Sequence, residues 1–147
     1  MVALTLNPIY EDEVFRIGFD KQFAVLELTF LRHPDAAHFR NAYNLAFGIA
    51  LSKNVKYWLT DATQIKVMER ESQAWLVENM TPLLKSNQIR RFAIVMAPEC
   101  FVMTNPNQVY EKPDSGNKAF SSGAIRVHFD KDAAYEWIFS SKETSTV

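Results

Sequence analysis

The stretch that most constrains the fold of this chain runs from residue 55 to residue 84. The apolar run Val55-Lys56-Tyr57-Trp58-Leu59-Thr60-Asp61 is typical of a β-strand. A short polar loop follows it, and the next segment predicts a helix because its apolar residues recur at helical spacing, as in Trp75, Leu76, Met80 and Leu83. A strand, a loop and a helix in this order are the repeating unit of an α/β domain.

The loop after this strand is the first place to look for a site. In an open α/β sheet, ligands bind in the crevice beyond the carboxyl ends of the strands. The residues at that position, which we take as candidates for binding a partner or a ligand, are Thr60, Asp61, Thr63 and Gln64. An alternative for Asp61 is an Asx turn, in which its carboxylate accepts hydrogen bonds from its own loop.

Alternation along the strand predicts two different faces. Val55, Tyr57 and Leu59 fall on one face, and Lys56, Trp58 and Thr60 fall on the other, which we expect not to be fully buried because it carries a lysine. Residues from other strands expected on this second face are Glu27, Thr29, Arg126 and His128. Trp58 and Lys56 are therefore candidates for a protein interface or a homodimer, unless a helix of the same domain covers the indole.

Periodicity and turn residues predict the other elements. They are a β-hairpin (Glu13–Gly18 and Phe23–Phe30), helices over 35–53, 69–87 and 130–140, and strands over 90–97 and 124–129. Pro82 predicts a kink or a break near residues 79–81. Together they predict an α/β fold with a mixed β-sheet, in which an N-terminal hairpin is followed by β-α units and the helices pack mainly on one face. A single domain over residues 1–140 and a flexible tail over 141–147 fit a length of 147 residues.

Charge and composition argue against several functions. The 16 Lys and Arg residues are matched by 17 Asp and Glu residues, whereas a nucleic-acid-binding surface needs concentrated positive charge. The longest uncharged stretch, residues 41–52, is well below the roughly 20 residues that a membrane span needs. The start of the chain lacks a basic leader, and the single Cys100 cannot form an internal disulfide. We therefore expect a cytoplasmic protein that neither binds nucleic acid nor inserts into a membrane.

The sequence carries no local signature of catalysis. Its three histidines, His33, His38 and His128, lack the close spacing of a metal motif, and its four glycines are too scattered to form a phosphate-binding loop. Cys100 lacks a basic neighbour in sequence, which favours a small apolar residue over a reactive thiolate. We expect no enzyme activity, no metal and no cofactor.

The least regular segment, residues 99–123, is rich in turn residues but also contains large apolar side chains. Those that would line an apolar pocket beneath this segment are Phe101, Met103, Tyr110 and Phe120. The alternative is a small satellite core formed by the same side chains.

The order and spacing of several segments resemble the bacterial SpoIIAA-like, STAS-related family over about residues 9–139. The segments that carry the resemblance are Val55–Asp61, Glu71–Trp75 with Pro82 downstream, Arg91–Ala97 followed by Pro98-Glu99, and Ile125–Asp130 with Ala134 and Trp137. The resemblance implies a STAS-like fold. STAS domains that antagonise anti-sigma factors carry a phosphorylated serine at the start of the helix after the central strand. Here that place reads Thr63 to Arg70 without a serine, so the phosphorylation switch is not expected.

The resemblance leaves two functions open. The first is a non-enzymatic regulatory or protein-interaction module that forms a homodimer and meets an unidentified regulatory protein through the loop after Asp61. The second follows from the grouping of related sequences with the lipid-carrying CRAL-TRIO domains. It is a carrier or sensor of a lipid or another apolar small molecule.

Overall fold

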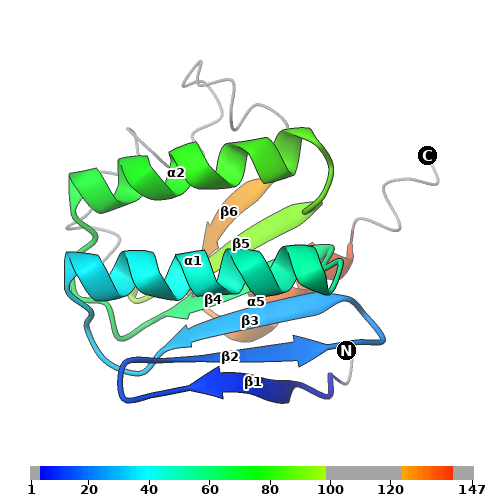
Figure 1. The fold of residues 1–147 in the computed structure, drawn as a ribbon, viewed down its shortest axis with the longest axis horizontal. Helices are drawn as coiled ribbons and strands as arrows, with labels where there is room; N and C mark the ends of the chain where they lie inside the picture. Colours follow the sequence, from blue (N-terminus) through cyan, green and yellow to red (C-terminus); the bar gives the residue numbers. More distant parts are fainter. Residues whose placement is uncertain (1–3, 99–123, 141–147) are drawn as a thin grey trace.

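The fold is built on one six-stranded sheet whose strands lie side by side in chain order (Figure 1). The computed structural model describes residues 4–98 and 124–140. The strands are β1 (Asn7–Glu11), β2 (Phe15–Asp20), β3 (Val25–Phe30), β4 (Tyr57–Ala62), β5 (Arg91–Met96) and β6 (Ile125–His128). The helices are α1 (Ala36–Ser52), α2 (Arg70–Lys85) and α5 (Lys131–Phe139).

The pairing of the strands confirms the predicted mixed sheet. β1 with β2 and β2 with β3 are antiparallel, whereas β3 with β4, β4 with β5 and β5 with β6 are parallel. The hairpin is thus followed by β-α units, as expected. Strand β1 was not predicted. All five of its residues are exposed, it contains Pro8, and its register with β2 shifts between Pro8 and Tyr10.

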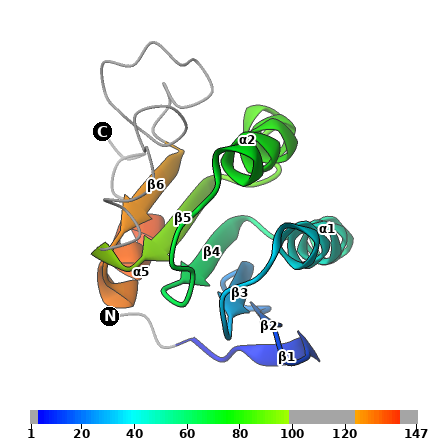
Figure 2. The same cartoon turned by 90° about the vertical axis from the view of Figure 1, so that its left-hand side faces the viewer.

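Helices cover both faces of the sheet. α1 and α2 lie on one face, whereas α5 lies on the other (Figure 2). The larger core lies under α1 and α2 and includes Phe30, Phe39, Tyr43, Trp58, Leu76, Met80 and Phe92. The smaller core lies under α5 and consists of Val25, Tyr57, Leu59, Ala93, Val95, Ala134, Trp137 and Ile138. The prediction that helices pack mainly on one face holds for α1 and α2, and α5 adds a third layer.

The parallel register corrects the predicted composition of the two faces. Leu26 lies opposite Trp58 and Glu27 lies opposite Leu59, so Glu27 shares a face with Leu59 and not with Trp58. Arg126 pairs with Ala93 on the same side. The expectation that Glu27, Thr29, Arg126 and His128 accompany Trp58 was therefore wrong. Alternation within one strand does not reveal its register against the next strand.

Strand β4 is also more buried than its lysine suggested. Lys56 lies just before the first residue of the strand, and from Tyr57 to Ala62 every residue except Asp61 is buried. The exposed fraction of Trp58 is 0 %, because the indole lies beneath α1 and stacks on Tyr43 with ring centroids 5.9 Å apart. The alternative in which a helix of the same domain covers Trp58 is therefore correct.

Two of the helices begin at an aspartate that caps them. The Asp35 carboxylate accepts a hydrogen bond from the His38 amide at the start of α1, and Asp130 caps α5 through the Ala133 amide. Helix α2 continues through Pro82 without the predicted break. Pro82 stands three residues before the helix end, and its missing amide removes one hydrogen bond of the ladder without ending the helix.

None of the helices within residues 4–98 and 124–140 combines the length and the apolar character required to cross a membrane.

A buried hydroxyl joins α1 to the sheet. Thr60 Oγ1 accepts one hydrogen bond from the Tyr43 hydroxyl and another from Trp58 Nε1, each 2.9 Å long. Burial raises the pKa of Tyr43, which keeps its hydroxyl protonated and able to donate. All three side chains are buried, so neither donor has water as an alternative partner.

Replacing Thr60 with Val should therefore destabilise the domain. The change removes the shared acceptor and leaves two buried donors unsatisfied, which lowers the free energy of unfolding by about 2–4 kcal/mol. Urea denaturation measures the loss. Thr60→Ser is the matched control, because it keeps the hydroxyl and should cost about 1 kcal/mol for the missing methyl group. Equal losses in the two variants would show that the hydrogen bonds contribute nothing.

Candidate functional site

The predicted site residues do not converge on one site. Successive residues of a strand point to opposite faces of a sheet. Thr60 accordingly lies in the core beneath α1, whereas Asp61 lies on the α5 side, and the Thr63 and Gln64 positions that follow are exposed. Thr60 has a structural role in this arrangement and faces no ligand site.

Asp61 also has a structural role. Its Oδ1 accepts hydrogen bonds from the Thr63 amide at 3.1 Å and from the Thr63 hydroxyl at 2.7 Å, which forms the Asx turn that the sequence left open. Its Oδ2 lies 3.2 Å from Lys131 Nζ at the start of α5. Both carboxylate oxygens are therefore occupied by groups of the same chain.

A buried polar cluster fastens α5 to the sheet. Glu27 Oε2 lies 3.1 Å from Lys131 Nζ and accepts a 3.2 Å hydrogen bond from the Thr29 hydroxyl, whereas Oε1 accepts a 2.5 Å hydrogen bond from the Tyr135 hydroxyl. Burial, together with the charge of Glu27, raises the pKa of Tyr135, so this hydroxyl stays protonated. Burial alone would lower the pKa of Lys131, but the attraction of Glu27 and Asp61 outweighs it and raises that pKa. The Glu27 charge is thus compensated within the domain.

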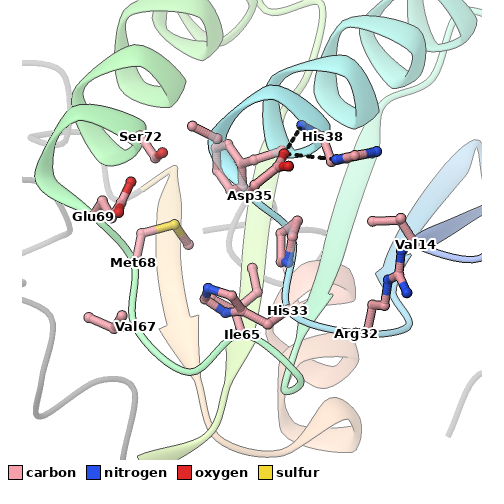
Figure 3. Close-up of a pocket in the computed structure, with 13 residues that line it drawn as sticks. Val14, Arg32, His33, Asp35, His38, Ile65, Val67, Met68, Glu69 and Ser72 are labelled. Atoms are coloured by element: carbon pink, nitrogen blue, oxygen red, sulfur yellow. Dashed lines mark hydrogen bonds and ion pairs between the residues drawn. The ribbon is translucent and has the colours of Figure 1, made fainter.

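A surface cleft lies at the carboxyl ends of β3 and β4. It has a volume of about 630 Å³ and opens between the first turns of α1 and α2, so we call it the interhelical cleft (Figure 3). This volume is within the range of small-molecule pockets, roughly 300–1,000 Å³. Its walls come from the loop between β3 and α1 and the loop between β4 and α2. These loops meet because β3 and β4 are parallel neighbours.

The cleft has an apolar floor and a polar rim. Buried apolar residues of the floor are Val14, Pro34, Phe39, Ile65 and Met68. The other lining residues are Arg32, His33, Asp35, Ala36, His38, Val67, Glu69 and Ser72. A mixed lining of this kind suits a group that is apolar in part and charged in part.

Two contacts hold the walls of the cleft. His33 Nδ1 accepts a 3.1 Å hydrogen bond from the Lys66 amide, which joins the two loops. Because Nδ1 is an acceptor, the neutral ring carries its proton on Nε2. In the second wall, the Gln73 side-chain amide donates a 2.7 Å hydrogen bond to the Met68 carbonyl oxygen. Both contacts arrange the lining before any ligand arrives.

The acidic residue at the α1 end of the cleft is held by local hydrogen bonds. Asp35 Oδ1 accepts hydrogen bonds from the amide and from Nδ1 of His38, both at 2.8 Å. These two donors lower the pKa of Asp35, so it is ionised at neutral pH. Its charge is directed at α1 and His38.

The cleft lies at the edge of the sheet that the sequence pointed to, but its lining residues differ from the predicted site residues. Sequence reasoning did not predict Arg32, His33, Asp35 or Ser72 as parts of a site, although Arg32 and His33 lie in the loop that follows β3. The signal that was available is the predicted parallel neighbour relation, which brings the ends of two consecutive strands together. The predicted pocket residues Phe101, Met103, Tyr110 and Phe120 lie outside the described residues, as does Cys100.

Two further predictions concern the interface and metals. Trp58 is buried and Lys56 is partly exposed, so the homodimer stays a prediction whose interface cannot use the indole. In the part of the chain that the structure describes, no group of three or more His, Cys, Asp or Glu side chains is placed to hold a metal ion.

Comparisons with protein-family models, with curated proteins and with solved structures each return no significant match. The function must therefore be argued from the site.

Replacing Asp61 with Ala should mainly lower stability, because both the Asx turn and the ion pair with Lys131 are lost. We expect the free energy of unfolding to fall by about 1–2 kcal/mol, measured by chemical denaturation. Asp61→Asn is the matched control, since its amide oxygen can still accept the Thr63 hydrogen bonds. Most of the loss should then be recovered. An Asn variant as unstable as the Ala variant would assign the effect to the ion pair.

The contribution of Lys131 should depend on pH. Its pKa is raised above the ordinary value of 10.5, so its attraction to Glu27 and Asp61 stabilises the fold fully below that value and disappears as the pH rises through the higher, folded pKa. Wild type should therefore exceed Lys131→Met in stability at pH values of about 7–9, and the difference should shrink above about pH 10.5. Paired denaturation curves at several pH values measure it. A difference that does not change with pH would exclude the charge as its source.

Proposed function

We propose that this chain is a non-enzymatic, STAS-like regulatory module that binds a segment of a partner protein in the interhelical cleft. The observation that carries the proposal is the cleft itself, with its volume of about 630 Å³ at the carboxyl ends of two parallel strands. The STAS-like part is supported by the element order, in which a hairpin precedes successive β-α units.

The lining of the cleft fits a peptide segment. A side chain of a partner can contact the buried floor formed by Phe39, Ile65 and Met68, while its backbone and polar groups meet the charged rim. Val67, a rim residue, is 39 % exposed and offers an apolar contact at the mouth. Interfaces commonly combine an apolar centre with a polar rim in this way.

A carrier of an apolar molecule is the weaker candidate. Such a carrier needs an enclosed, predominantly apolar cavity. The interhelical cleft instead has Arg32, His33 and Glu69 along its rim. Burying a fully apolar ligand here would leave these charged groups beside hydrocarbon, which is unfavourable.

Site-specific photocrosslinking in cells of the source organism tests the proposal. A p-benzoylphenylalanine at Val67 should form an adduct with one partner, because this residue lies at the mouth of the cleft. Adding Ala36→Trp should abolish the adduct, since Ala36 lines the cleft and the indole fills it.

Ala37→Trp provides the matched control. Ala37 is the next residue of α1 and is also exposed, but it does not line the cleft, so the adduct should persist. Equal adduct yields in the two Trp variants would overturn the proposal. Circular dichroism of both variants shows whether α1 is intact.

A further inference from the structure

One polar side chain in the interhelical cleft has unused hydrogen-bonding capacity. Ser72 lies in the first turn of α2, lines the cleft and is only 5 % exposed. Figure 3 shows its hydroxyl on the side that faces α1. Within residues 4–98 and 124–140, no hydrogen-bond partner is recorded for this hydroxyl. Because this hydroxyl opens onto the cleft and none of the described side chains engages it, it can donate a hydrogen bond to a ligand held there.

The first turn of α2 also has free donors. The amides of Arg70, Glu71 and Ser72 precede the first intrahelical hydrogen bond, which runs from the Gln73 amide to the Glu69 carbonyl oxygen. Glu69 stands at the N-cap position, but its side chain makes no capping hydrogen bond. Helix α1 differs, because Asp35 caps it. The end of α2 therefore offers donors together with the positive end of a 16-residue helix dipole.

The charged side chains around the cleft differ in whether another group of the chain already binds them. Arg32 is exposed, lines the cleft and has no ion pair among the described residues, and His33 presents Nε2–H when neutral. Of the two acidic residues that line the cleft, Asp35 accepts hydrogen bonds from His38 and Glu69 is exposed. Glu69, together with Glu71 in the first turn of α2, opposes a negative ligand.

We propose that the first turn of α2 and the Ser72 hydroxyl form a binding site for a compact oxyanion, a carboxylate or a phosphate group. This inference rests on the proposed function, because the partner segment would carry the anionic group. The amides only donate, the helix end is positive, and Ser72 adds one more donor, a set that matches a carboxylate or phosphate and not a cation. Arg32 attracts the anion from across the cleft.

Titration of the full chain with sodium acetate and, separately, with sodium phosphate tests the site. The readout is the ¹H–¹⁵N spectrum at constant ionic strength, with sodium chloride as the reference. We expect saturable shifts of the Glu71, Ser72 and Gln73 amides with a dissociation constant on the order of millimolar. Saturation by acetate alone indicates a carboxylate, by phosphate alone a phosphate group, and by both a general oxyanion site.

Matched variants identify the binding groups. Ser72→Ala should weaken binding about tenfold, whereas Ser86→Ala, at the other end of α2, should leave it unchanged. Arg32→Gln should weaken binding, and Glu69→Gln should strengthen it because a repulsive charge is removed. The inference is overturned if neither salt gives saturable shifts beyond those of chloride, or if Ser72→Ala binds as tightly as wild type.

The proposed function is tested apart from this site. If the photocrosslink at Val67 depends on an open cleft but no anion binds, the partner segment is received without an oxyanion contact. If the anion binds but no cleft-dependent adduct forms, the module binds a small anion and not a protein segment. The second outcome would also overturn the inference that the bound anionic group belongs to a partner segment.

Discussion

The parallel register between β3 and β4 is the constraint on which the rest of the structure depends. It sets Leu26 beside Trp58 and Glu27 beside Leu59. One face is therefore mainly apolar and is covered by α1 and α2, while the other face carries a buried acidic residue. That residue requires the charge of Lys131 and the hydroxyl of Tyr135, both from α5. The same register aligns the two strand ends and so creates the walls of the interhelical cleft.

Much of the fold could be predicted because it is determined locally. Asp35 and Asp130 cap helix starts by accepting hydrogen bonds from amides three residues further on, and the predicted helices over 35–53 and 130–140 begin at these residues. What could not be predicted depends on relations between distant segments. The environment of Glu27 is set by residues more than 100 positions away, and nothing in the sequence near Glu27 indicates them.

The candidate site shows the same division. Asp61 and Thr60 were candidates because polar residues end a central strand. Each is engaged in a structural contact, since Asp61 accepts hydrogen bonds from its own loop and Thr60 accepts them from two buried donors. Ser72 drew no attention, because a serine in a predicted helix is unremarkable until its burial and its neighbours are known. Polarity in the sequence is therefore a poor guide to function here. Unused hydrogen-bonding capacity in the folded chain is a better one.

The position of α5 has a consequence for synthesis of the chain. The apolar residues Val25, Tyr57 and Leu59 have left the ribosome long before Trp137 and Ile138, which cover them. Until then the nascent sheet has only its α1 and α2 face closed, and its second face is exposed to solvent or to other chains. We therefore expect a chain that ends before residue 131 to leave this face of the sheet uncovered by α5.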